Sequence, residues 1–228
     1  MFRKFRELLG SENLLEAAYA TTVTMLEFDA KMYAASCKVL RRTDGVDLPF
    51  DIRRTDRKIN KYEREVRRNV LTHLAVTGTQ NLVPGLVLVS IVIDVERIGD
   101  YTKNIVELAS MHPKRLHGGT READLSHIES WIEQLFPVVN SVLRTQDQTA
   151  ARSIMSREPE IGSLSESIVA DMILQRDPEV APPQAVSLAL YARYLKRINA
   201  HLTNIASAIV NPFHRIGFRE KKQRKAKE

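Results

Sequence analysis

The chain has a single cysteine, Cys37, among its 228 residues, which excludes an internal disulfide framework and is typical of a reducing compartment. Nine glycines and nine prolines are few for this length, and alternation of β-branched residues is scarce, so we expect an all-α fold. The longest apolar run, residues 82–93, is shorter than the roughly 20 residues that a bilayer span needs. The first ten residues, MFRKFRELLG, are basic but lack the apolar core of a signal peptide. These absences predict a helical cytoplasmic protein.

The net charge of +6 belongs mostly to the end of the chain. Residues 214–228 contain seven lysines or arginines and two glutamates, a balance of +5, so the rest of the chain carries about +1. Such a basic tail has little apolar surface to bury, and we expect it to be disordered. It could attract an anionic membrane surface or nucleic acid, or simply keep the protein in solution.

Residues 81–111, NLVPGLVLVSIVIDVERIGDYTKNIVELASM, predict one long central helix. Its first part is apolar almost all round, as expected of a helix buried on every side. Residues at steps of three and four then form a packing seam: Ile91, Val95, Ile98, Thr102, Ile105 and Ala109. A polar stripe follows the roughly opposite side: Glu96, Asp100, Asn104 and Glu107. The segment RIGDYTKNIVEL from Arg97 has a near copy, RINAHLTNIASA, from Arg197, which indicates an internal repeat of 100 residues.

Periodicity and turn residues predict six helices, with a boundary between the third and fourth at residues 113–120. Their approximate ranges are 11–41, 50–76, 81–112, 123–144, 148–175 and 184–210. Ser11 or Asn13 can cap the first, and the fifth is expected to be interrupted or bent near Pro159 and Gly162. The outer surface of the second should be strongly basic.

The string DVERIGDYTKNI, with Glu96 and Asp100 as an E-x-x-x-D pair, resembles the signature helix of the PhoU family of phosphate-transport regulators. The resemblance extends over about residues 10–211 and is strong in the first half and degraded in the second. It implies two tandem, pseudo-symmetric three-helix bundles, residues 11–112 and 121–211, followed by a basic tail at 214–228.

Carboxylates at the helix spacing suggest a metal site. Glu96 and Asp100, one turn apart, project from one face, and packing of the second helix would bring two more acids opposite them. The four candidate ligands are Asp56, Glu63, Glu96 and Asp100. Carboxylate oxygens suit hard divalent or trivalent cations, and the resemblance implies iron or zinc. Alternatively, the stripe is a solvated helix face with Arg97 and Lys103 as surface partners.

The second half departs from this pattern. Lys196 and Ala200 stand where the first copy has its acid pair, and the fifth helix offers about Glu158 and Ser165 as counterparts of the other two acids. At most one intact metal site is therefore expected. The histidines show no chelating spacing and are predicted to be surface or loop residues: His73, His112, His117, His127, His201 and His214.

The resemblance implies a regulator of phosphate transport rather than an enzyme. It would bind a phosphate transporter or its sensor kinase at the inner face of the membrane. The resemblance also implies a homodimer. A metal-dependent hydrolase of phosphate esters and nucleic-acid binding through the tail are the alternatives. No motif for specific nucleic-acid recognition is present, so no specific nucleic acid is expected.

Overall fold

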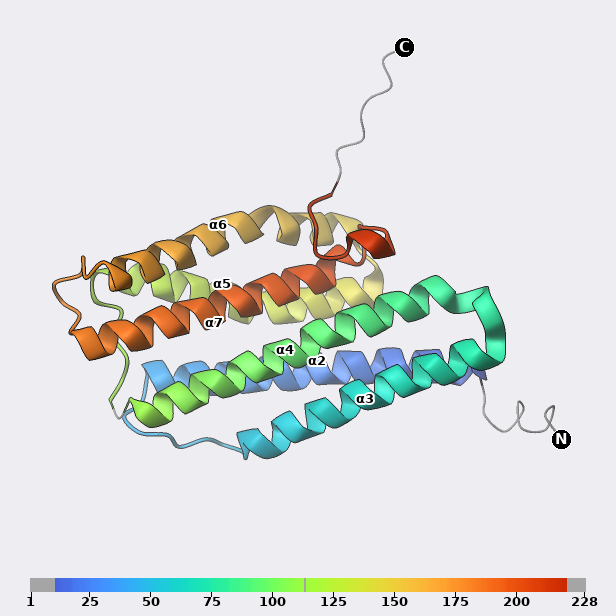
Figure 1. The fold of residues 1–228 in the computed structure, drawn as a ribbon, viewed down its shortest axis with the longest axis horizontal. Helices are drawn as coiled ribbons and strands as arrows, with labels where there is room; N and C mark the ends of the chain where they lie inside the picture. The colour runs from blue at the N-terminus through green and yellow to red at the C-terminus, as the bar shows by residue number, and fades with distance from the viewer. Residues whose placement is uncertain (1–10, 113, 221–228) are drawn as a thin grey trace, which may run out of the picture.

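The computed structural model describes residues 11–112 and 114–220, with side chains from Leu14 onward (Figure 1). The elements are α2 (Ser11–Arg41), α3 (Ile52–Thr77), η1 (Gly78–Asn81), α4 (Leu82–Met111), η2 (Gly119–Arg121), α5 (Glu122–Thr145), α6 (Gln148–Ile173), α7 (Pro182–Ser207) and η3 (Phe213–Arg215). Over these ranges there is no strand, which confirms the all-α prediction. No helix in the same ranges is both long enough and apolar enough to cross a bilayer. The side chains of the predicted caps Ser11 and Asn13 lie outside this description, as do the basic first ten residues and tail residues 221–228.

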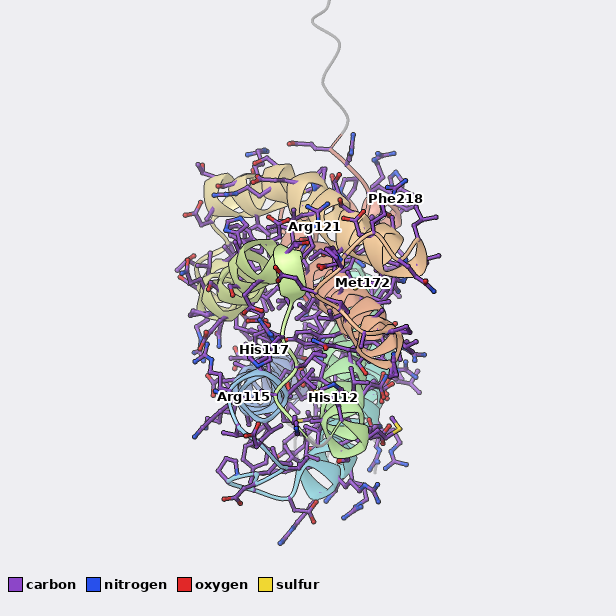
Figure 2. The ribbon with its side chains drawn as sticks, turned by 90° about the vertical axis from the view of Figure 1, so that its left-hand side faces the viewer. His112, Arg115, His117, Arg121, Met172 and Phe218 are labelled. Carbon is purple, nitrogen blue, oxygen red and sulfur yellow. The ribbon has the colours of Figure 1, made fainter. Side chains whose placement is uncertain are left out.

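The six long helices form two bundles of three (Figure 1). Helices α2, α3 and α4 pack on one another, as do α5, α6 and α7. The bundles meet where α4 lies along α7 and α2 lies along α5, as the end-on view in Figure 2 shows. The predicted tandem arrangement is therefore confirmed, and the acid-bearing face of α4 packs against α3 within the first bundle.

Local chemistry explains where the helices begin and end. The Asp51 side chain accepts a hydrogen bond from the Arg54 amide (2.9 Å) and caps α3, and Asp147 caps α6 in the same way. Gly78, with φ of +70°, ends α3. Of the two outcomes expected for the fifth helix near Pro159, interruption or bending, interruption does not occur. Helix α6 is continuous, and it is bent into an arch over its length (Figure 1).

The packing seam of α4 is confirmed, since all six of its predicted residues are buried. The expectation that residues 82–93 are covered on every side is wrong. Val83 is 60% exposed, and it borders an apolar groove of about 460 Å³ that Leu15 and Ile209 also line. The start of α4 lies at one end of the molecule, where the ends of α2 and α7 cover only part of its circumference.

The segment after α7 also differs from expectation. The tail was predicted to be disordered from residue 214, yet residues 213–220 fold back on the second bundle. Asn211 Nδ2 donates to the carbonyls of Arg215 and Phe218 (3.0 and 2.6 Å). The Gly217 amide donates to Ser207 Oγ at 2.8 Å. These bonds hold the first basic residues of the tail against α7.

A buried ion pair joins the two bundles. Arg41, near the end of α2, has a side chain only 5% exposed, and its Nε lies 2.7 Å from Glu129 Oε1 on α5. The same guanidinium pairs with Glu122 and donates to the carbonyl of Leu116 in the connecting segment. The Tyr191 hydroxyl of α7 donates to Glu129 Oε1 at 2.9 Å. One guanidinium therefore contacts α5 and the connection between the bundles.

Beside this network, Cys37 is buried. Its sulfur lies 3.3 Å from the Tyr191 hydroxyl, and burial raises the pKa of its thiol to about 12.

Removal of the buried guanidinium should be costly. We expect Arg41→Ala to lower the free energy of unfolding by about 3–5 kcal/mol, because Glu129 is left buried without its charged partner. Arg144, also on α5, makes a pair with Glu27 of α2 in which both side chains are at least half exposed. Arg144→Ala should cost less than about 1 kcal/mol. Urea denaturation of both variants would test this, and equal losses would show that burial of the Arg41 pair has no special role.

Candidate metal centre

The four acids predicted from the sequence lie along the interface of α3 and α4. Asp56 is buried, and the side chains of Glu63, Glu96 and Asp100 are 15%, 18% and 29% exposed. Burial raises the pKa of Glu96, and the charges of Asp100, Glu63 and Asp56 raise it further, while Arg97 lowers it. The four acids therefore form one electrostatic cluster that is partly withdrawn from solvent, while Glu107, further along the same stripe, is exposed.

Basic side chains partly balance this cluster. Lys103 Nζ lies 3.2 Å from Asp56 Oδ1 and 3.1 Å from Asp100 Oδ1, so it connects α4 to α3. Burial disfavours its charge, but the hydrogen bonds to Asp100 and Asp56 outweigh this effect and raise the pKa of Lys103. Arg97 pairs with Glu96 and Asp100 at 3.7 and 3.5 Å from a more exposed position. Both predicted basic partners are present, and Lys103 is an inter-helix contact rather than a surface one.

A fifth carboxylate, Asp29 of α2, belongs to the cluster and was missed from the sequence. It is fully buried, and neither carboxylate oxygen has a hydrogen-bond partner among the described residues. Its burial raises the pKa well above the usual value, and the charges of Glu96, Asp56 and Asp100 add to the effect. The signal was an acid three residues from Leu26 and three from Met32 on the apolar face of the first helix.

Gly99 makes room for Asp29. A Cβ atom at position 99 would lie 3.1 Å from Asp29 Oδ1 and 3.3 Å from Ile59 Cδ1, closer than most side chains tolerate. The glycine within the E-x-x-x-D segment therefore allows the α2 carboxylate to approach the backbone of α4 closely. This contact brings the Asp29 carboxylate of α2 close to the part of α4 that carries the acid pair.

The chemistry of these donors suits a hard cation, because unpaired buried carboxylate oxygens are stabilised by a bound ion. The side chains are not arranged around one point, however. Across residues 11–112 and 114–220, no three histidine, cysteine, aspartate or glutamate side chains form a group that could hold a metal ion as they stand. Between Asp56 and Asp100, the positive charge is that of the Lys103 ammonium group. An ion would have to compete with this ammonium.

The corresponding face of the second bundle carries different groups. Lys196 pairs with Glu166, and Ala200 leaves space where the first bundle has a carboxylate. Glu158 is half-buried, and Ser165 is buried and donates to the carbonyl of Ile161 at 2.9 Å. The acid pair of the first bundle has no counterpart on α7.

Two histidines are not surface residues, contrary to prediction. His73 is 1% exposed, and its Nε2 lies 3.1 Å from Asn81 Nδ2. His201 is 7% exposed, and its Nδ1 lies 2.7 Å from Asp94 Oδ1, which also accepts a hydrogen bond from Asn204 at 3.0 Å. Asp94 belongs to α4, and His201 and Asn204 belong to α7. The contact of His201 with Asp94 therefore joins the two bundles. Nothing in the spacing of residues along the chain indicates this partner.

A family model described as the PhoU domain matches the chain twice, at residues 22–109 and 125–209. The chain belongs to the PhoU family. It is 24% identical over 210 residues to the phosphate-specific transport system accessory protein PhoU homolog of Deinococcus radiodurans, covering 90% of this chain and 95% of that protein.

Two solved PhoU structures share the fold. PhoU from Pseudomonas aeruginosa aligns with a TM-score of 0.77 at 20% identity, over 87% of this chain and 96% of that one. The phosphate transport system regulatory protein PhoU from Streptococcus pneumoniae aligns with a TM-score of 0.69 at 18% identity, over 89% and 94%. The PhoU resemblance carried by the E-x-x-x-D segment is thus confirmed over both bundles.

Asp29 should make the metal-free protein sensitive to pH. The folded state keeps a proton on Asp29 at pH values where the unfolded chain, with a carboxyl pKa of about 4, has lost it. Stability should therefore fall as pH rises from about 4 through the raised pKa. Asp29→Asn removes this fall and should stabilise the protein above that pKa by about 1 kcal/mol or more.

Urea denaturation with a chelator at pH 5 and pH 8 measures this effect. The exposed Asp47→Asn provides a control that should behave as the wild type does. Parallel pH profiles for the wild type and Asp29→Asn would contradict the assignment of a buried, unpaired carboxylate.

Proposed function

We propose that this PhoU-family protein is a regulatory accessory protein of phosphate transport. It acts at the cytoplasmic face of the membrane by binding a phosphate transporter or its sensor kinase through its helix surfaces. Family membership and the name of the Deinococcus radiodurans relative support the accessory role. The observation that carries the mechanism is the composition of α3, which has carboxylates on its inner face and a band of basic residues on its outer face.

The outer face of α3 is a strongly basic surface, which we call the α3 stripe. Its exposed residues are Arg53, Arg54, Arg57, Lys58, Lys61, Arg64, Arg67 and Arg68. Arg67 pairs with Glu63, and Lys58 lies 4.4 Å from the centre of the Phe28 ring. The other six make no ion pair with any residue in the described ranges. Unpaired cations of this density favour an acidic partner.

Helix geometry aligns the central part of the stripe. Arg57, Lys61, Arg64 and Arg68 follow one another at steps of four and three, so they share one line along the helix. The line continues into Leu71, which is 69% exposed. Helix α3 lies at the edge of the molecule remote from the second bundle (Figure 1). An acidic segment of a partner protein with an apolar residue at one end would complement this surface.

In this proposal, binding of a metal ion at the inner face of α3 regulates the protein. Asp56 and Glu63 of α3, with Glu96 and Asp100 of α4 and Asp29 of α2, would hold one divalent or trivalent ion such as iron or zinc. The ion would supply positive charge to the buried acids, and no catalytic turnover is assigned to it. Because the same helix carries the stripe, ion binding that changes the packing of α3 would alter the surface presented to the partner. A homodimer and contact of the tail with an anionic membrane remain predictions.

Metal content tests the inner face. Protein purified without added metal or chelator should contain about one ion per chain, and Glu96→Gln/Asp100→Asn should contain none, because the acid pair is lost. Lys103→Met should retain or gain metal, since it removes the competing ammonium. Glu107→Gln, on the same stripe of α4 but exposed, provides the matched control.

Mass spectrometry of the released ions gives the occupancy, and circular dichroism checks that each variant is folded. A wild type that binds no iron, zinc or other ion even after reconstitution would rule out this centre while leaving the partner-binding role intact.

Charge reversal tests the α3 stripe. We expect Arg57→Glu/Arg64→Glu/Arg68→Glu to reduce crosslinking to the cytoplasmic parts of the phosphate transporter or sensor kinase by at least about tenfold. The same variant should disturb the cellular response to phosphate. The control Lys31→Glu/Lys38→Glu/Arg42→Glu makes the same change in net charge at two exposed positions of α2 and at the exposed residue that follows it.

Affinity capture of these named partners from crosslinked cells, together with a phosphate-starvation reporter, provides the two readouts. Equal effects of the α2 and α3 variants would show that net charge rather than the stripe determines binding. Unchanged capture by the α3 variant would exclude the stripe as the docking surface.

A further inference from the structure

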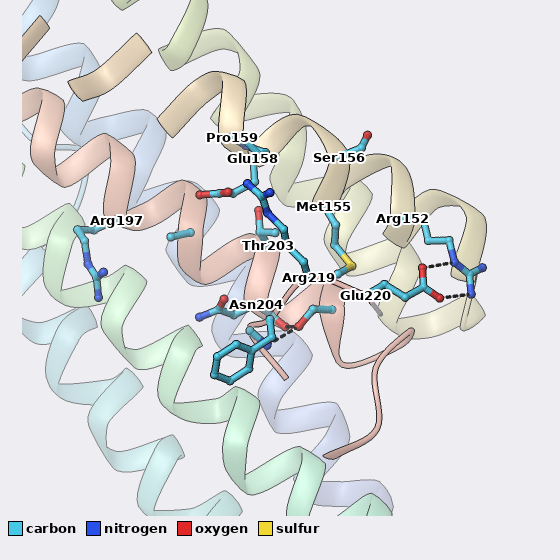
Figure 3. Close-up of a pocket in the computed structure, with 14 residues that line it drawn as sticks. Arg152, Met155, Ser156, Glu158, Pro159, Arg197, Thr203, Asn204, Arg219 and Glu220 are labelled. Atoms are coloured by element: carbon cyan, nitrogen blue, oxygen red, sulfur yellow. Dashed lines mark hydrogen bonds and ion pairs between the residues drawn. The ribbon is translucent and has the colours of Figure 1, made fainter. Parts of the chain in front are cut away.

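A cavity of about 690 Å³ opens on the second bundle between α6, α7 and the segment that folds back after α7 (Figure 3). Its volume lies within the range of about 300–1,000 Å³ that is usual for small-molecule sites. Arg152 from α6, Arg197 from α7 and Arg219 from the returning segment all line it. Three separate parts of the chain thus bring guanidinium groups to one space.

This cavity occupies the place in the repeat that the carboxylate cluster occupies in the first bundle. Arg197, Ala200 and Asn204 line it, and the 100-residue period matches them to Arg97, Asp100 and Asn104. Ala200 removes both the bulk and the charge of the matching aspartate. Where the first bundle concentrates negative charge, the second has space bordered by arginines.

Two of the three arginines lack an acidic partner. Arg152 forms a two-bonded pair with Glu220 at 2.9 and 3.0 Å, as the dashed lines in Figure 3 mark. Arg197 contacts only the Tyr101 hydroxyl (3.3 Å), the Tyr101 ring and His201 Nε2 (3.5 Å). The Arg219 side chain makes no hydrogen bond or ion pair with the described residues. The guanidinium groups of Arg197 and Arg219 are therefore available to an anion.

Other lining groups define the kind of anion. Thr203 lines the cavity, and its Oγ1 is buried without a hydrogen-bond partner in the described part of the chain, so rotation of this side chain would offer the hydroxyl to a ligand oxygen. Met155, Pro159 and the 63%-exposed ring of Phe218 add apolar surface. Glu158 also lines the cavity and has no ion-pair partner among the described residues. Its negative charge and the positive charges of Arg197 and Arg219 sum to a local charge of about +1.

The returning segment forms a fixed wall rather than a loose cover. Gly217 has φ of +81°, a conformation that favours glycine, and its amide is bonded to Ser207 Oγ. A Cβ atom at position 217 would lie 3.2 Å from Asn204 Oδ1, and the Asn204 side chain is held in turn by Asp94 of α4. The position of Arg219 is thus set by hydrogen bonds on both sides of the turn.

We propose that this cavity binds a phosphate-bearing small molecule. Arg197 and Arg219 contact the phosphate oxygens, which guanidinium groups match in geometry and charge, and Thr203 donates its hydroxyl hydrogen to the same group. Met155, Pro159 and Phe218 accommodate any organic part. The ligand is either inorganic phosphate or an organic phosphate, and the two share the recognised group. The site goes beyond the proposed function, since it requires neither the metal centre nor a protein partner.

Isothermal titration of the purified full-length protein with inorganic phosphate, and separately with ATP, at constant ionic strength tests the proposal. Saturable binding of both probes would indicate a site for the phosphate group itself, and binding of ATP alone would indicate an organic phosphate. Arg219→Gln and Arg197→Gln should each weaken binding about tenfold or more, as loss of a charge-assisted hydrogen bond predicts. Glu158→Gln should tighten binding, because it removes the opposing charge.

Arg193→Gln, an exposed arginine of α7 that does not line the cavity, provides the control and should leave binding unchanged. The Arg219 side chain makes no hydrogen bond or ion pair with the described residues, so its variant should fold normally, and circular dichroism checks this. No saturable binding of either probe by the wild type would overturn the proposal. Binding that survives both arginine variants, or that Glu158→Gln weakens, would overturn the assignment to this cavity. These results are independent of transporter binding and of metal content.

Discussion

The relation between the two bundles depends on one buried guanidinium. Arg41 of α2 reaches across to Glu129 of α5 and also takes the carbonyl of Leu116, so it fixes both the neighbouring bundle and the connection that leads to it. Because the Arg41 side chain is only 5% exposed, its charge needs a paired carboxylate at that position. This requirement restricts how α5, which carries Glu129, can pack against α2. With that approach set, α4 lies along α7, and Asp94 meets His201. The two three-helix units therefore form one body with a defined interface.

Within that body, the repeated halves have opposite electrostatic character. In the first, Asp100 sits one turn after Glu96 and above the buried carboxylate of Asp29. In the second, Ala200 vacates the matching position and Arg197 lines the resulting cavity. A helical bundle tolerates this change because the packing seam, on the other side of the helix, carries most of the apolar burial. The polar stripe is consequently free to diverge while the fold is retained.

The helices and the α4 seam could be predicted because they follow from local periodicity. The E-x-x-x-D pair could be found for the same reason, since its two acids are one turn apart. Asp29 could not be placed with them, because it lies 67 residues before Glu96 and joins the cluster only through packing against Gly99. His201 was misplaced for an equivalent reason: its partner, Asp94, is 107 residues away. The return of residues 213–220 was also missed, since composition does not reveal the side-chain bonds that Asn211 makes to the backbone.

Helix α4 is the element through which the two polar regions can influence each other. One side of it presents Glu96 and Asp100 to α3, and another presents Asp94 to His201 and Asn204 of α7. Asn204 lines the cavity, so a displacement of α4 caused by the proposed ion would reach the cavity wall through the Asp94–Asn204 hydrogen bond. Coupling free energies between binding sites are reciprocal. An anion that fixes this wall would therefore bias ion binding in the first bundle by the same factor, without any contact between the ligands.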